Sequence, residues 1–93
     1  MPTTIYFTFN SSPIPRNAQV KIHWKGFLSG YSSYQADDSG AITVSDDELK
    51  GSSRTAEHIY VRLKRNERAY AKDNVTIRKN DDDFCDVTTW RRT

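Results

Sequence analysis

The stretch QADDSGAITVSDDEL, Gln35 to Leu49, decides how the rest of the chain is interpreted. It holds five acidic residues around one glycine, Gly40, so it is either a cation-binding loop or a turn that enters a β-strand. A calcium loop of the EF-hand type needs regularly spaced acidic ligands before its glycine and a glutamate six residues after it. Here Asp46 occupies that later position, and the residues before Gly40 do not match the ligand spacing. We therefore interpret the stretch as a hairpin turn whose aspartates bind nearby backbone, and we expect no metal or other cofactor.

The residues after this turn predict a short strand and then one turn of helix. The segment AITV alternates as a strand does. Ser45 can cap the helical turn, with Glu48 three residues later as its partner in a capping box. Gly51 then ends the turn, so we expect helix near residues 46–50, too short to be stable by itself.

Apolar residues recur with a period of two along most of the chain, and they are largely β-branched or aromatic, which favours strands. The predicted inward-facing sets are Ile5, Phe7 and Phe9; Val20, Ile22 and Trp24; Ile42 and Val44; Ile59, Val61 and Leu63; and Val75 and Ile77. Strand centres lie about ten residues apart, as in sandwiches and barrels. The sequence predicts an all-β fold, a single antiparallel β-sandwich of about seven strands, in one domain over residues 1–93.

Several pieces resemble a known family when taken in order. Ala18 is a small residue that opens an apolar strand, the glycine turn DDSGAITV follows, and Leu49, Gly51 and Tyr60 come after it. Over residues 12–64 this order resembles the transthyretin-like, or carboxypeptidase regulatory-like, β-sandwich. The resemblance implies a transthyretin-like or Ig-like sandwich and an accessory or binding role. The enzymatic branch of the family, the hydroxyisourate hydrolases, ends in Tyr-Arg-Gly-Ser, whereas this chain ends in TTWRRT, so that activity is not carried over.

Charge is small overall and uneven along the chain. The net charge of +2 does not indicate a strongly basic protein, but seven Lys/Arg and two Asp/Glu lie between Arg62 and Lys79. One interpretation is a single face, suited to phosphates and single-stranded bases, that would be formed by Arg62, Lys64, Arg68, Lys72 and Arg78 with Tyr60 as a stacking ring. The alternative, which we favour, is the solvated face of a sheet whose lysines and arginines guard its edges against aggregation.

Trp90, followed by Arg91 and Arg92, has two interpretations. It either packs onto the end of the sheets or forms an exposed anchor for a partner, since Trp and Arg are common in binding hot spots. The sequence does not separate these. The candidate binding face therefore comprises Tyr60, Arg62, Lys64, Arg68, Lys72, Arg78, Trp90, Arg91 and Arg92.

Catalytic chemistry has little support. Cys85 is the single cysteine, so no intrachain disulfide forms, and the aspartates around it should raise the pKa of its thiol. His23 and His58 together with Cys85 cannot complete a tetrahedral zinc site without a carboxylate. We interpret Cys85 as a buried or half-buried strand residue and expect a protein that is not an enzyme.

We expect a non-catalytic protein-interaction or structural module, a small inhibitor or assembly component that acts through a sheet face or edge strand. Its expected partner is another protein, and self-association stays open. One alternative is nucleic-acid binding through the basic face around residues 60–79, and a second is a small hydrolase of the transthyretin-like family that uses His23, His58 and arginines. No signal-peptide pattern or membrane-length apolar run is visible, so we expect a cytoplasmic protein with no membrane partner.

Overall fold

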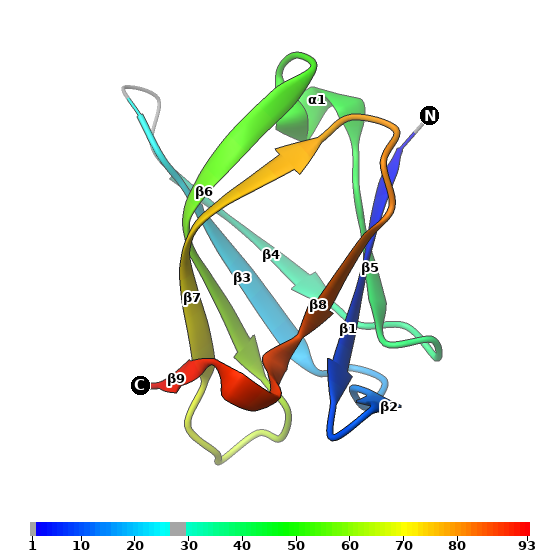
Figure 1. Ribbon diagram of the computed structural model, residues 1–93, viewed down its shortest axis with the longest axis vertical. Helices are drawn as coiled ribbons and strands as arrows, with labels where there is room; N and C mark the ends of the chain where they lie inside the picture. Colours follow the sequence, from blue (N-terminus) through cyan, green and yellow to red (C-terminus); the bar gives the residue numbers. More distant parts are fainter. Residues whose placement is uncertain (1, 27–29) are drawn as a thin grey trace.

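The computed structural model describes residues 2–26 and 30–93 (Figure 1). In order along the chain the elements are β1 (Thr3–Phe9), β2 (Ser12–Pro13), β3 (Gln19–Trp24), β4 (Gly30–Gln35), β5 (Ala41–Val44), α1 (Asp46–Leu49), β6 (Ser53–Arg62), β7 (Tyr70–Arg78), β8 (Asp83–Asp86), the 3-10 turn η1 (Val87–Thr89) and β9 (Arg91–Arg92). The segment KGFLSG, residues 25–30, in which the bracketing glycines predict a turn, lies partly outside the described residues.

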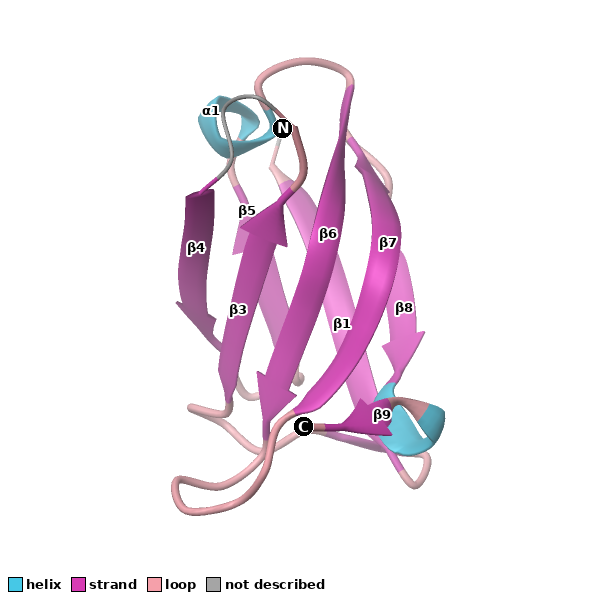
Figure 2. Cartoon of the chain, turned by 90° about the vertical axis from the view of Figure 1, so that its left-hand side faces the viewer, coloured by secondary structure: helices cyan, strands magenta, loops and turns pink. Residues whose placement is uncertain are grey.

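The strands form two sheets that lie one behind the other (Figure 2). Sheet A consists of β2, β1, β5 and β8, and sheet B has the order β4-β3-β6-β7-β9. The prediction of a mostly β, mostly antiparallel fold is confirmed. The described residues contain nine strands rather than about seven, because β2 and β9 are two-residue pairings too short to leave an alternation in the sequence.

One pairing departs from the expected antiparallel pattern. β1 pairs with β5 and β2 in the antiparallel sense, but it pairs with β8 in parallel, with Ile5 opposite Asp83 and Thr8 opposite Asp86. Parallel partners need a long crossover between them, and here most of the chain separates the two strands. Nothing local in the segment DFCD specifies that direction.

The turn at Gly40 is not a hairpin, and this corrects the sequence interpretation. β4 pairs with β3 in sheet B, whereas β5 pairs with β1 in sheet A, so the turn carries the chain from one sheet to the other. The Phe7 amide donates to the Gly40 carbonyl at 2.9 Å. A Cβ on Gly40 would meet the Phe7 carbonyl oxygen at 2.9 Å, so only a glycine lets the two backbones approach this closely.

The local chemistry of that turn is as predicted. Oδ1 of Asp37 accepts from the amides of Ser39 at 2.8 Å and Ala41 at 3.0 Å. Gly40 has φ +72°, which suits its turn position. This carboxylate is therefore engaged by its own loop.

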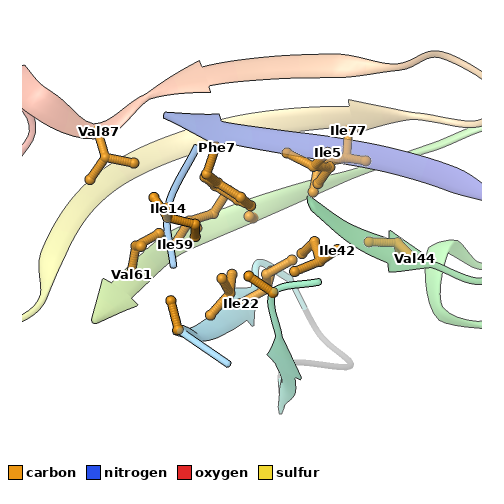
Figure 3. Packing of buried hydrophobic residues seen from close by; sticks show 14 of the residues in the cluster. Ile5, Phe7, Ile14, Ile22, Ile42, Val44, Ile59, Val61, Ile77 and Val87 are labelled. Carbon is orange, nitrogen blue, oxygen red and sulfur yellow. The ribbon is translucent and has the colours of Figure 1, made fainter. Parts of the chain in front are cut away.

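The core lies between the two sheets and is built from the predicted inward faces (Figure 3). Ile5, Phe7, Ile22 and Ile59 are at most 1% exposed. The remaining predicted positions that are buried are Val20, Trp24, Ile42, Val44, Val61 and Ile77, while Phe9, Leu63 and Val75 are partly buried against the cluster. The alternation therefore predicted the core-facing side of each long strand correctly.

The helical turn begins at its predicted cap. The Glu48 amide donates to Ser45 Oγ at 3.2 Å, and the turn ends at Lys50, with φ 55°, one residue before Gly51. The Glu48 carboxylate accepts from Ser32 Oγ at 2.6 Å, and Ser32 Oγ in turn accepts from Trp24 Nε1 at 3.0 Å. This chain of hydrogen bonds ties α1 to β3 and β4, which makes up for the instability of so short a helix. No helix in the described part of the chain is long and apolar enough to cross a membrane.

Candidate binding surface on the outer face of sheet B

The side of sheet B that faces away from the core carries the alternate residues of β3, β4 and β6. On β3, Lys21 and His23 point outward, because Val20, Ile22 and Trp24 between and beside them are buried. The antiparallel register places His23 opposite both Tyr31 of β4 and His58 of β6, and it places Lys21 opposite Tyr60. Residues far apart in the sequence therefore meet on one surface.

Four rings on this surface contact one another, and we call His23, Tyr31, His58 and Tyr60 the ring cluster. His23 lies at its centre. Its ring centroid is 5.4 Å from that of Tyr31 in a stacked arrangement, 5.3 Å from Tyr60 and 6.1 Å from His58, the last two nearly edge-on. Tyr31 is 62% exposed, so most of its ring faces solvent. The cluster is therefore a group of contacting rings across three strands, in which Tyr31 stacks on His23 while the Tyr60 and His58 rings are inclined to it.

Cationic groups border the ring cluster. Lys21 Nζ lies 4.8 Å from the centroid of the Tyr31 ring, within cation–π distance. Arg62 is exposed and lies two residues beyond Tyr60 on the same side of β6. Arg91 on β9 reaches the same face from the other direction. The surface therefore combines aromatic faces with positive charge.

Asp73 of β7 is held between two of these groups. Its Oδ1 accepts from Arg91 Nη2 at 2.9 Å and lies 2.7 Å from His58 Nδ1. The hydrogen bond from Arg91, followed by that from His58, lowers the pKa of the Asp73 carboxyl. The same contact raises the pKa of the Arg91 guanidinium. Asp73 thus orients the His58 ring, and its negative charge is offset by Arg91.

An open hollow of about 690 Å³ adjoins the ring cluster. His23 and Tyr60 line it from the cluster, and Lys21 and Arg62 supply positive charge. The polar side chains around it include Gln19, Ser33 and Gln35 from β3 and β4. The hollow offers stacking, charge and hydrogen-bonding groups within one space.

The nine residues predicted from sequence do not form one face. Tyr60, Arg62 and Arg91 lie at the surface just described. Lys64, Arg68 and Arg92 line a separate hollow at the end of the sheets, where the Arg92 guanidinium lies 5.1 Å from the Tyr70 ring centroid. The basic segment is divided because it runs through a strand, a turn and a second strand that point in different directions.

The other three predicted residues lie elsewhere. Lys72 lines a hollow beside Cys85 at the open edge between β7 and β8, and Arg78 ends β7. Trp90 is 9% exposed and packs edge-on to Phe7, with 6.2 Å between ring centroids. Its ring belongs to the core, so of the two interpretations that the sequence left open the packed one holds and the exposed anchor does not.

The sequence prediction missed most of this surface. The missing residues are Lys21, His23, Tyr31, His58 and Asp73. Alternation had already placed Lys21 and His23 outward on β3. The absent information was the register, which sets β3 between β4 and β6 and thereby joins the four rings.

Cys85 is apart from both histidines. It lies on β8 of sheet A and packs against the core, whereas the ring cluster is on the outer side of sheet B. Burial, followed by the charge of Asp83, raises the pKa of the Cys85 thiol to about 11, as the flanking acids led us to expect. A thiol so placed is a poor nucleophile.

The fold and this surface define a small two-sheet β protein with an aromatic and cationic sheet face. No family model and no curated protein matches the sequence.

Proposed function

We propose that this chain is a single β-sandwich domain of the transthyretin-like or Ig-like kind that acts as a non-catalytic binding module. Its outer face of sheet B recognises a negatively charged partner. The observation that carries the proposal is the ring cluster, which gathers on the solvent side of the sheet and is bordered by Lys21, Arg62 and Arg91. The expected protein partner and the nucleic-acid alternative are both compatible with a negatively charged partner.

Exposed aromatic side chains need an explanation when they are grouped. Tyr31 and Phe84 are the large apolar residues that stand out as exposed in the described part of the chain, and Tyr31 belongs to a cluster of four rings. Tyr and Arg are enriched where proteins bind partners, because they offer large contact areas together with polar groups. The ring cluster has that composition.

The sign of the charge supports an anionic partner. Lys21 and Arg62 are cationic side chains at the hollow. Asp73 lies on the same face, but it is paired with Arg91, so it opposes an approaching anion less than a lone carboxylate would. Positive groups around a concave surface attract anions over several ångströms, and this attraction falls as salt screens it.

The hydrolase alternative has weaker support from the contacts. The contact of Asp73 with His58 Nδ1 is one that a hydrolase could use to orient a general base, but the described neighbours of both histidines within the cluster are rings, with no serine or cysteine among them. Cys85, the strongest intrinsic nucleophile in the sequence, lies on the other sheet. The contacts around the two histidines suit a rigid recognition surface.

Retention on immobilised heparin, a polyanion, tests the proposal. The double variant Lys21→Glu/Arg62→Glu should elute at clearly lower salt than the parent protein. The matched control Arg16→Glu/Lys79→Glu changes the net charge by the same amount at exposed or half-exposed sites elsewhere and should elute later than the first variant. Equal shifts in the two variants would show that only total charge matters and would reject a localised site. Circular dichroism checks that both variants are folded.

A further inference from the structure

We propose that the partner of this face is single-stranded nucleic acid, whose bases stack on the ring cluster while its phosphates contact Lys21 and Arg62. This inference rests on the proposed function and narrows it to one chemical class of ligand. The observations that carry it are the ring cluster with its exposed Tyr31, the position of Lys21 Nζ near the Tyr31 ring and the polar lining of the hollow.

The ring cluster offers aromatic side chains for stacking at the surface of the sheet. They occupy three adjacent strands, β4, β3 and β6, which lie about 4.8 Å apart in a sheet. Tyr31 at one side is 62% exposed and leads through its stacked neighbour His23 to Tyr60. Each unpaired base has a π face that can stack on the exposed Tyr31 ring, so binding of this kind tolerates many sequences.

The cations stand where the phosphates of a stacked strand would pass. Lys21 Nζ is 4.8 Å from the Tyr31 ring centroid, so a base on the cluster brings its backbone near that ammonium group. Arg62 is at the same hollow beyond Tyr60 and can hold a second phosphate with its planar guanidinium. Each phosphate neutralised on a single strand makes log K fall by about 0.7 per decade of salt.

The hollow suits an unpaired base. Gln19, Ser33 and Gln35 line it beside the rings, and amide and hydroxyl groups can both donate to and accept from base edges. Its volume of about 690 Å³ lies within the range of known small-ligand pockets. Single strands are the form of nucleic acid whose bases can turn out to fill such a space.

Two other anions fit less of the surface. An acidic polypeptide would use Lys21 and Arg62 but would leave the exposed face of Tyr31 without a planar partner. A duplex would supply phosphates, but its base faces are already stacked on one another. The combination of open ring and adjacent cation therefore favours the single strand.

Fluorescence anisotropy with a labelled 12-nucleotide single strand, as DNA and as RNA, tests the inference on the full chain. We expect saturable binding whose log–log salt slope is about −1.4, from two phosphates. Tyr31→Ser should weaken binding roughly 5- to 150-fold, the effect of one base–aromatic stack. The control Phe84→Ser removes a ring on the other sheet that is 77% exposed, and it should leave the binding affinity unchanged. Lys21→Gln should weaken binding and reduce the slope by about 0.7.

Competition separates the ligand classes. Unlabelled single strand should displace the probe, whereas an equal concentration of duplex, polyglutamate, mononucleotide or inorganic phosphate should displace much less. Competition by polyglutamate equal to that by the single strand would overturn the inference in favour of an acidic protein partner, and equal competition by duplex would overturn base stacking.

The oligonucleotide and heparin experiments together distinguish this inference from the proposed function. If the oligonucleotide fails to bind while heparin retention still depends on Lys21 and Arg62, this inference fails and the proposed function stands. If that dependence is also absent, both fail.

Discussion

His23 and Tyr31 stand directly opposite each other on β3 and β4, and their rings stack with 5.4 Å between centroids and 18° between planes. β4 is the edge strand of sheet B, so this cross-strand contact helps to hold the edge in place. The same pair forms half of the proposed recognition surface. Stability and binding are therefore linked at these two residues.

The stacked pair should have a measurable coupling energy. In a double-mutant cycle, Tyr31→Ala and His23→Ala should each lower the free energy of unfolding, and the double variant should lose less than their sum by about 0.5–1 kcal/mol. Urea unfolding measures each value. Tyr31→Ala with Phe84→Ala, on different sheets, is the control pair and should be additive. Additivity of His23 and Tyr31 within about 0.3 kcal/mol would contradict the stacking contact.

Two phenylalanines of opposite burial provide a test of the core. Phe7 is 0% exposed and Phe84 is 77% exposed. Phe7→Ala should lower the free energy of unfolding by about 3–5 kcal/mol, because it removes buried apolar area and leaves a cavity. Phe84→Ala loses its stack on Tyr6 and should cost less than about 1.5 kcal/mol. Chemical denaturation measures both.

Phe7→Leu covers the case in which Phe7→Ala does not fold. It keeps most of the apolar volume and should fall between the two alanine variants. Equal losses for Phe7→Leu and Phe84→Ala would contradict the position of Phe7 at the centre of the core.

Gly40 should be the glycine that tolerates alanine least. A Cβ there would lie 2.8 Å from the Ile14 amide nitrogen, and φ is +72°, so Gly40→Ala should destabilise the fold by at least about 1–2 kcal/mol. Gly30 has no heavy atom within 4 Å of an added Cβ, so Gly30→Ala should be neutral or slightly stabilising. Thermal unfolding of the two variants compares them. Similar melting temperatures would show that the turn at Gly40 does not approach β1 as closely as described.

The strand faces could be predicted from sequence because a half-buried strand must alternate. Ile5, Ile22 and Ile59 were assigned inward for that reason, and all three are buried. The pairing of strands could not be predicted in the same way. The parallel contact between β1 and β8 joins segments from opposite ends of the chain, and the turn at Gly40 has the composition of a hairpin although it joins two sheets.

The candidate surface was predictable strand by strand but not as a whole. Lys21 and Tyr60 were each placed outward by alternation, yet a one-residue change of register between β3 and β6 would separate them. For Trp90 the composition of the sequence suggested a binding role that the structure does not support. A tryptophan next to two arginines has the composition of a hot spot, and only the contact with Phe7 in the tertiary structure shows that it is core.

Cys85 should react slowly with thiol reagents in the folded protein. Its pKa is raised to about 11, first by burial and then by Asp83, so its thiolate fraction at pH 8 is roughly two orders of magnitude below that of a free cysteine. Alkylation by iodoacetamide should accelerate about tenfold per pH unit between pH 8 and 10, and on unfolding in urea. Asp83→Asn should speed the native reaction, because removing that charge lowers the pKa of the thiol. Native and unfolded rates that agree would contradict the buried position of Cys85.

Asp73 should contribute to stability at neutral pH and lose that contribution in acid. Its hydrogen bonds from Arg91 and His58 lower the pKa of the carboxyl in the folded protein. The carboxyl of Asp73 has a lower pKa in the folded protein than in the unfolded chain, where the pKa is about 3.9. The carboxylate therefore stabilises the fold at pH values above about 3.9, and this stabilisation is lost as the pH falls through the folded-state pKa. Asp73→Asn should therefore be less stable than the parent at pH 7, and the difference should vanish well below pH 3.9. Urea midpoints across this range measure the effect, with Asp82→Asn, in an exposed loop, as the control. A stability difference between parent and Asp73→Asn that stays constant at all pH values would show that the carboxylate charge is not what matters at this position.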